Sequence, residues 1–290
     1  MLTRRLLLKK SLMLPAALQL GSISDILSEL YGRKFKIGAC DWSIGKRSSI
    51  EAFAVAKEIG VDGIMVDVGA PSNNLHLRQK SVQEDYLKES KQTGIAISSL
   101  ALGVFNQVPF HSHAETEQWV SGSIDAAKAL NVKVLLLAFF NASDLRNDDK
   151  RKDAAVRILK NVIAKAEANG VTLGIESYLN AKEHIEIIDR VGSKNVKVYY
   201  DFRNTADAGF DTVEEFKKLG KDLVCELHMK ENGFLLDKGT INWKEVSKAV
   251  YDMGYRGDGW MQIEGALPKD AEIVSSYKHN LSYLKGLFGK

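Results

Sequence analysis

Short runs of apolar residues recur along this chain, and a segment with the apolar spacing of an amphipathic helix follows each one. The apolar runs cover residues 35–42, 63–68, 95–102, 132–139, 171–177, 196–201, 223–230 and 259–265. The helical segments cover residues 48–59, 82–93, 115–130, 148–169, 183–191, 213–219, 243–253 and 271–287. Continuous apolar strands that alternate with helices are typical of a parallel sheet whose faces are covered by helices.

Eight such units over roughly 250 residues predict one α/β domain, a (β/α)8 TIM barrel that spans residues 35–288. An open doubly wound sheet is the alternative, but no glycine-rich phosphate-binding motif follows the first run. No change in composition marks a second domain. Ser48 or Ser49 is expected to cap the first helix, and glycines such as Gly60, Gly94 and Gly170 are expected to end helices.

Residues 1–30 do not fit the repeat and have the pattern of an export signal followed by a connector. Thr3, Arg4 and Arg5 precede a leucine-rich stretch, as in a twin-arginine motif, and residues 11–20 are modestly hydrophobic. A basic start and a short apolar segment are typical of a signal peptide rather than a transmembrane helix. We therefore expect export to the periplasm. The alternative is an amphipathic N-terminal helix on a cytoplasmic protein.

The net charge of +3 depends on this leading segment. Residues 1–20 hold four basic residues and no acid, so removing them leaves a body of about −1, which has no electrostatic footprint for nucleic acid. No apolar run approaches the ~20 residues that a membrane-spanning helix needs, so stable membrane insertion of the mature chain is not expected. The two cysteines, Cys40 and Cys225, are expected to be free thiols. The composition leaves a homo-oligomer open.

Four consecutive strands in the second half of the chain end in side chains that are able to bind a metal ion. These side chains are Glu176, Asp201, His228 and Glu264. Since functional groups of a TIM barrel lie at the carboxyl ends of its strands, we expect the four to converge at one rim. Three carboxylates and one imidazole suit Mn²⁺ or Mg²⁺ and tolerate Zn²⁺.

Around these residues the chain resembles the xylose isomerase-like TIM-barrel superfamily of sugar isomerases and epimerases. The matching segments are GIES at Glu176, YYDFRN at Asp201, ELHMKE at His228 and GYRGDGWMQIEG at Glu264. The resemblance implies that these four positions bind one divalent metal ion, usually Mn²⁺, Mg²⁺ or Co²⁺. It also implies that the two glutamates are catalytic and move protons next to a sugar carbonyl through an enediolate.

Further residues are candidates for binding a small sugar or keto-sugar substrate. Lys230 is two residues beyond the strand-seven histidine and projects to the same rim, while Trp42 and Trp260 lie on neighbouring strands and are able to stack on a sugar face. Asp41, Asn106 and Asn204 are candidate polar contacts.

Two departures from the family bear on the substrate. Asn204 stands where many epimerases of the family have a histidine, and Phe234 stands where they often have an arginine. Both family residues contact the carbonyl end of the sugar. The departures therefore leave the metal site intact and count against the usual ketose 3-epimerase reaction.

Two alternative functions use the same barrel. A keto-glycoside lyase or hydrolase needs the same proton chemistry. A nuclease that resembles endonuclease IV needs three zinc ions and several additional histidines, whereas this chain has six histidines in all and only His228 ends a strand. His111 and His113, in the loop after the third strand, are the remaining candidates for a further metal site.

Overall fold

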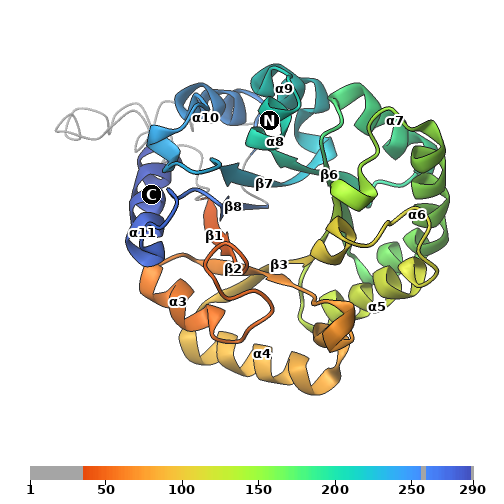
Figure 1. Cartoon of the computed structure of the whole chain (residues 1–290), viewed down its shortest axis with the longest axis horizontal. Coiled ribbons are helices and arrows are strands. Elements are labelled where there is room, and N and C mark those ends of the chain that lie inside the picture. The colour runs from red at the N-terminus through yellow and green to blue at the C-terminus, as the bar shows by residue number, and fades with distance from the viewer. Residues whose placement is uncertain (1–34, 256–258, 289–290) are drawn as a thin grey trace, which may run out of the picture.

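The computed structural model describes residues 35–255 and 259–288, and these form a closed barrel of parallel strands inside a ring of helices (Figure 1). The strands are β1 (Lys36–Cys40), β2 (Gly63–Asp67), β3 (Ala96–Leu102), β4 (Val134–Phe139), β5 (Thr172–Ser177), β6 (Val196–Asp201), β7 (Val224–Lys230) and β8 (Trp260–Glu264). Each strand pairs with the next, and β1 pairs with β8. The predicted (β/α)8 barrel is confirmed.

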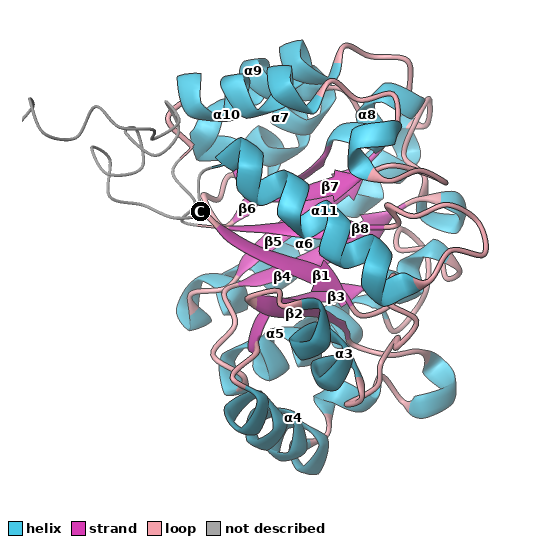
Figure 2. Ribbon diagram, turned by 90° about the vertical axis from the view of Figure 1, so that its left-hand side faces the viewer, coloured by secondary structure: helices cyan, strands magenta, loops and turns pink. Residues whose placement is uncertain are grey.

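Helices follow the strands and form the outer layer when the barrel is seen from the side (Figure 2). They are α3 (Ala52–Ile59), α4 (Lys80–Thr93), α5 (Thr116–Ala129), α6 (Asp149–Asn169), α7 (Ala181–Val191), α8 (Phe202–Asp207), α9 (Thr212–Leu223), α10 (Trp243–Asp252) and α11 (Ile273–Phe288). Short 3-10 helices are η1 (Pro71–Asn73), η2 (His76–Arg78), η3 (Gly103–Asn106), η4 (Asn141–Ser143) and η5 (Leu236–Lys238). None of the described helices is long and apolar enough to cross a membrane.

The predicted export segment, residues 1–30, lies outside the described residues and stays a prediction. Within the described part, both cysteines, Cys40 and Cys225, are free thiols, as expected.

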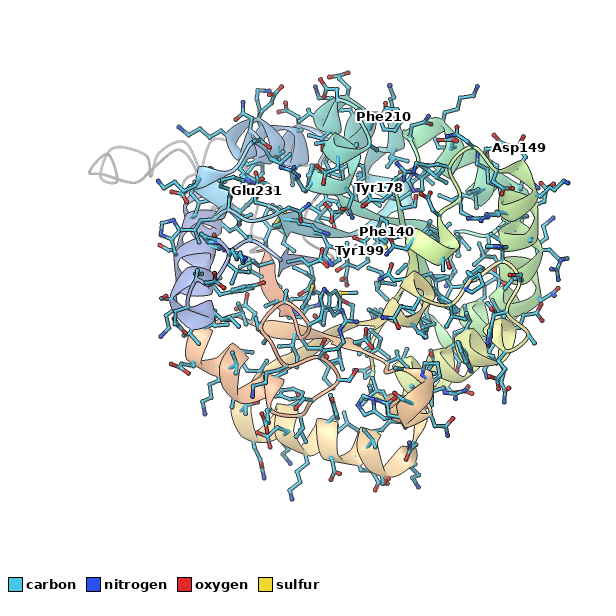
Figure 3. All side chains as sticks on the ribbon, viewed as in Figure 1. Phe140, Asp149, Tyr178, Tyr199, Phe210 and Glu231 are labelled. Carbon is cyan, nitrogen blue, oxygen red and sulfur yellow. The ribbon has the colours of Figure 1, made fainter. Side chains whose placement is uncertain are left out.

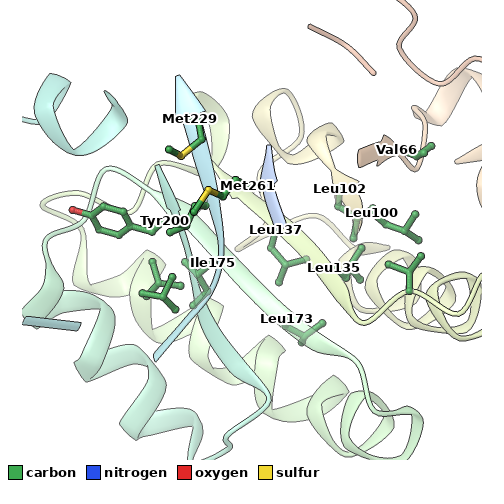
Figure 4. Packing of buried hydrophobic residues seen from close by; sticks show 14 of the residues in the cluster. Val66, Leu100, Leu102, Leu135, Leu137, Leu173, Ile175, Tyr200, Met229 and Met261 are labelled. Atoms are coloured by element: carbon green, nitrogen blue, oxygen red, sulfur yellow. The ribbon is translucent and has the colours of Figure 1, made fainter. Parts of the chain in front are cut away.

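The strands are apolar throughout because they pack on two sides. Along β4, Leu135 and Leu137 belong to the large core between the barrel and the helices (Figure 4). Leu136 and Ala138 belong instead to a smaller core that fills the barrel. Successive side chains of a strand point to opposite faces, so one strand supplies both cores.

The same alternation aims the rim residues. Tyr199 belongs to the inner core and lies near the barrel axis (Figure 3), so Asp201, two residues further along β6, also points inward. On β7, the buried Glu226 accepts a hydrogen bond of 2.9 Å from the Tyr199 hydroxyl, and His228 follows two residues later. Asp201 and His228 are partners in the β6–β7 register, so they reach the rim at the same height.

Two local predictions need correction. The first helix begins at Ala52 rather than Ser48, because Ser48 has a positive φ of 52° and its backbone N–H donates to Asp41 Oδ2. Helix α8 was not predicted, and it begins immediately after Asp201. By contrast, the predicted stops at Gly60, Gly94 and Gly170 are confirmed, each glycine having the left-handed conformation expected of a helix C-terminus.

Candidate metal centre and active-site cavity

The four predicted metal ligands meet at the carboxyl-end rim of β5 to β8. One ligand atom from each of Glu176, Asp201, His228 and Glu264 lies within 4.8 Å of the others. Nδ1 of His228 is 2.8 Å from Glu176 Oε1 and 3.5 Å from Glu264 Oε2. Asp201 Oδ2 is 3.9 Å from the same nitrogen. The tertiary structure thus brings together all four residues that the strand ends predicted.

Asp201 has a separate task for each of its carboxylate oxygens. Oδ1 accepts hydrogen bonds from the backbone N–H groups of Arg203 and Asn204 and so caps α8. Oδ2 is buried and accepts no hydrogen bond from any described residue. The nearest cation to it is the Lys230 ammonium at 3.5 Å, so this oxygen still has its hydrogen-bonding capacity free for a ligand from outside the chain.

The buried acids create a demand for positive charge. Burial raises the pKa of Asp201 to about 7. Burial would lower the pKa of His228, but Glu176 and Glu264 outweigh burial and raise it well above its ordinary value. Without a cation the group therefore retains protons on the histidine and in part on the aspartate. A divalent cation would supply the missing charge and displace those protons.

The donor set fits a small divalent ion. Ligands at the ~2.1 Å distance typical of Mg²⁺ are separated by up to about 4.2 Å across the ion, so a group within 4.8 Å needs only a slight contraction. Carboxylate oxygens with one imidazole nitrogen suit Mn²⁺ or Mg²⁺. Nε2 of His228 faces away from the carboxylates, 3.5 Å from the thiol of Cys40, which leaves Nδ1 as the ligand atom.

Lys230 and Trp42 both contact Glu264. The Lys230 ammonium is 3.0 Å from Glu264 Oε2, because β7 and β8 pair these two residues in register. The Trp42 indole N–H donates to Glu264 Oε1 over 2.7 Å. Burial alone would raise the pKa of Glu264, but Lys230 and His228 outweigh it and lower the pKa to about 2. Glu264 is therefore an ionised carboxylate, fixed through both oxygens.

Asn204 also lies at the metal centre. Its side-chain amide donates to Glu176 Oε1 over 3.2 Å, and the residue is buried. Phe234, at the other position where the chain departs from the family, is 47% exposed. Asn204 thus positions a ligand, whereas Phe234 leaves an apolar surface on the loop after β7.

A cavity of about 170 Å³ opens beside the metal centre. Its lining consists of Trp42, Arg47, Asp67, Ala101, Gly103, Asn106, Leu136, Ala138, Phe140, Glu176, Lys230 and Glu264. Of the four ligands, only Glu176 and Glu264 line it. A molecule in this cavity therefore meets the two glutamates and Lys230, while Asp201 and His228 stay behind them.

The other predicted substrate contacts divide between the two ends of the barrel. Asn106, at the end of η3, lines the cavity, and its buried Oδ1 has no partner among the described residues. Trp260 does not reach this site, so its prediction is corrected. It begins β8, four residues or about 13 Å before Glu264, and lines a separate hollow at the opposite mouth. There Lys36 packs over its ring at 5.2 Å.

Arg47 and Asp67 are lining residues that sequence reasoning missed. Asp67 ends β2 with a buried carboxylate. The four predicted ligands were identified by the same signal, so Asp67 could have been predicted from the sequence. Arg47 lies in the loop after β1, where no periodic pattern marks it.

The described residues contain one group able to hold a metal ion, and His111 and His113 are not part of it. His113 packs against Trp119 with a ring separation of 4.6 Å and accepts a hydrogen bond from the Glu115 backbone. Within the described part of the chain, these two histidines therefore do not join a group of potential metal ligands.

Comparison with known proteins gives a consistent family match. A family model described as the xylose isomerase-like TIM barrel matches residues 53–287. The crystal structure of D-psicose 3-epimerase from Clostridium cellulolyticum H10 with D-tagatose has a TM-score of 0.73 to this chain and covers 88% of it and 99% of its own length. The sequence identity is 16%, so this likeness shows the shared fold.

Two curated relatives resemble the chain in sequence. The 2-epi-5-epi-valiolone 7-phosphate 2-epimerase of an Actinoplanes species is 23% identical over 68% of this chain and 72% of its own length. The D-psicose 3-epimerase of Enterocloster bolteae is 31% identical, but over only 40% of this chain and 42% of its own length.

Proposed function

Because the chain belongs to the family of xylose isomerase-like TIM barrels, we propose that it is a divalent-metal-dependent sugar epimerase or isomerase. The proposed reaction is proton transfer at a carbon next to a carbonyl. Both curated relatives are epimerases by name, which supports an enzyme of the isomerase class.

The proposal rests on one observation: two of the four candidate metal ligands line the cavity and two do not. Two carboxylates, Glu176 and Glu264, belong to the metal group and also line the space where a substrate would lie. A reaction that removes a proton and returns it elsewhere needs two groups that exchange protons in reach of one carbon. The chain supplies that pair.

The residues would share the work as follows. Glu176, Asp201, His228 and Glu264 would hold one divalent ion, Mn²⁺ or Mg²⁺ by donor type, with Co²⁺ and Zn²⁺ as further candidates. When bound, such an ion supplies Lewis-acid polarisation of a carbonyl.

One glutamate removes the proton next to the carbonyl, and the other returns a proton to the opposite face or to the adjacent carbon. Lys230 lines the cavity, and its ammonium group would donate a hydrogen bond to the substrate oxygen on which negative charge develops. Asp201 and His228 need not touch the substrate. Their positions behind the glutamates hold the reacting carboxylates in place.

Exchange of substrate protons with solvent tests this function. Wild-type protein is stripped of metal, reloaded with Mn²⁺ and incubated in D₂O with a panel of ketoses and keto-glycosides, and NMR follows loss of the proton next to the carbonyl. We expect exchange that depends on Mn²⁺. If no sugar exchanges while Mn²⁺ is bound, proton transfer is not the reaction of this site.

A keto-glycoside lyase or hydrolase is the second candidate, and the contact between Lys230 and Glu264 favours it. An ammonium group 3.0 Å from a carboxylate that removes a proton is able to protonate a departing oxygen. The same NMR experiment separates the two reactions, because a lyase releases the aglycone whereas an epimerase or isomerase retains every substituent.

A further inference from the structure

The cavity has a second polar wall, formed by Arg47 and Asp67 and lying across the barrel from Glu176 on β5. Arg47 comes from the loop after β1 and Asp67 from the end of β2. The guanidinium Nη1 of Arg47 donates a hydrogen bond of 2.8 Å to Asp67 Oδ2. This ion pair has no part in the metal group, and nothing in the proposed proton transfer uses it.

Asp67 holds Arg47 in place and has little capacity left for a substrate. Its Oδ1 accepts hydrogen bonds from the Gly69 backbone at 2.8 Å and from the Ser48 hydroxyl at 3.2 Å, while Oδ2 accepts from Arg47. The carboxylate is buried, with 3% of its side chain exposed. Asp67 is therefore a positioning residue rather than a substrate contact.

Arg47 retains free donors that face the cavity. A guanidinium has five N–H donors, and within the described residues the pair with Asp67 uses one of them. Its central carbon lies 5.5 Å from the ring centroid of Trp42, whose indole N–H donates to Glu264 of the neighbouring strand β8. The side chain is 54% exposed although its guanidinium contacts both Asp67 and Trp42.

Glycine at position 103 is required by this arrangement. A Cβ atom added to Gly103 would lie 2.5 Å from Asp67 Oδ2 and 3.1 Å from Arg47 Nη1. The carboxylate is held by three hydrogen-bond donors and has no room to retreat. Any larger residue at 103 would therefore displace the ion pair.

The charges of the cavity balance. Its lining has two cations, Arg47 and Lys230, and three carboxylates, Asp67, Glu176 and Glu264. When Asp201 is counted with the acids and a divalent ion with the cations, the total negative charge equals the total positive charge. A phosphate or carboxylate group on the substrate would bring negative charge without a cation to receive it.

A third cation, Arg146, is connected to the cavity lining through two aromatic rings, and it is also paired with an acid. Arg146 binds Asp144 through a fork of hydrogen bonds, and its guanidinium lies 4.4 Å from the ring centroid of Tyr178. Tyr178 packs edge-on against Phe140 of the cavity lining, and Figure 3 shows both near the barrel mouth. The approach to the cavity is thus aromatic and charge-balanced.

We propose that this cavity takes an uncharged sugar, and that Arg47, held by Asp67, donates hydrogen bonds to the hydroxyl oxygens at the end remote from Glu176. The inference rests on the proposed function, since it names the substrate class of the same site. It places the chain with the relative named for D-psicose rather than with the relative named for a phosphorylated substrate.

The test compares D-psicose with D-psicose 6-phosphate in the Mn²⁺-loaded protein, using solvent proton exchange. We expect kcat/KM to be at least about tenfold higher for the free sugar. Arg47→Met should raise KM for the free sugar about tenfold, as expected for loss of charge-assisted hydrogen bonds, while kcat stays within about threefold. Gly103→Ala should have the same effect by displacing the pair.

Lys46→Met is the matched control, because Lys46 neighbours Arg47 but pairs with Glu51 and does not line the cavity. It should leave KM unchanged, and all variants should keep the Mn²⁺-induced rise in melting temperature. Preference for the phosphorylated sugar, or an unchanged KM in Arg47→Met, would overturn the inference.

Binding separates this inference from the proposed reaction. If neither sugar undergoes exchange, the reaction fails, and the sugar-induced rise in melting temperature of the Mn²⁺-loaded protein decides the inference. A rise with D-psicose that is lost in Arg47→Met supports the uncharged-sugar site. No rise in the wild type overturns it.

Discussion

The two halves of the barrel rim both bury carboxylates, but they satisfy them differently. On the β1–β4 half, Asp67 is paired with Arg47, and Asp41 accepts backbone N–H groups from Ser48 and Asp67. On the β5–β8 half, three carboxylates and His228 converge on one point, and the Lys230 ammonium lies 3.0 Å from Glu264 Oε2 and 3.5 Å from Asp201 Oδ2.

This contrast separates a structural acid from a candidate functional one. Burial raises the pKa of Asp41 to about 8, and the neighbouring Asp67 adds to the effect, so Asp41 stays protonated and fastens the loop after β1. The acids of the first half are held by nearby groups of the chain, whereas the second half gathers three acids around one point, where a divalent cation would bind under the proposed function. Convergence of several acids on one point therefore distinguishes the two roles better than residue type or burial.

The largest effect should come from removing the one imidazole of the metal group. His228→Ala should weaken Mn²⁺ binding at least about 100-fold, beyond the 10–100-fold typical of residues that only support a ligand, and reduce proton exchange to background. Metal titration followed by melting temperature is the measurement. Full retention of Mn²⁺ affinity in this variant would mean that the β5–β8 half is not a metal centre.

Converting an acid to its amide should affect the two halves very differently. Glu176→Gln and Glu264→Gln should each slow exchange at least about 100-fold, or about 2.7 kcal/mol of barrier, because a proton-transfer group is lost. The same change in Asp41→Asn should alter exchange less than about threefold, since Asp41 does not line the cavity. The assay is exchange at saturating Mn²⁺. Equal losses in all three variants would remove the distinction between the halves.

Trp42 links the halves, and its loss should have an intermediate effect. Trp42→Phe keeps an aromatic ring beside Arg47 but removes the N–H that binds Glu264 Oε1. A hydrogen bond to a charged group contributes about 1.5–3 kcal/mol, so exchange should slow by about 10- to 150-fold. Mn²⁺ affinity should fall much less than in His228→Ala, and an unchanged rate would show that this hydrogen bond does not position Glu264.

The smallest effect at neutral pH should come from Asp41→Asn, which instead changes the pH dependence of stability. The folded-state pKa of about 8 lies above the unfolded value of 3.8, so stability from this proton is complete below about pH 4 and is lost as the pH rises toward 8. The amide cannot lose that proton. The melting temperature of the variant should therefore fall less than that of the wild type between pH 5 and 9.

Two neighbouring charges, Asp67 and Arg47, act on Asp41 in opposite directions and remain in the variant. Asp125→Asn on the exposed face of α5 is the control, and its pH profile should match the wild type. Parallel profiles for Asp41→Asn and the wild type would contradict a protonated Asp41.

The barrel and the metal group were readable from the sequence because both follow from local rules. An apolar strand that ends in Glu176 or Glu264 must bury its length and deliver its last side chain at a rim. Parallel strands place all such ends on the same side, so the convergence of four residues needed no knowledge of contacts. Asp67 also ends an apolar strand, so its position at the rim could have been predicted in the same way.

The prediction for Trp260 was wrong because it did not take into account where the residue lies along its strand. Trp260 and Glu264 are close in sequence, yet a rise of ~3.3 Å per residue places them at opposite ends of β8. Asp201 was predicted only as a metal ligand, and the structure adds a second role, since its Oδ1 caps α8. Helix α8 escaped prediction because it has only 6 residues and depends on that cap.

The chain's sequence alone determined the barrel, the rim at which its chemistry lies and the four residues that converge there, since periodicity and strand polarity are local properties. Which charges find partners within the chain depends instead on the three-dimensional arrangement. Arg47 belongs to an irregular loop, and its pairing with Asp67 across the β1–β2 junction depends on the space left by Gly103. Loop conformation is set by contacts between distant segments, because no repeating hydrogen-bond pattern imposes it, so the cavity wall formed by Arg47 and Asp67 could be recognised only in three dimensions.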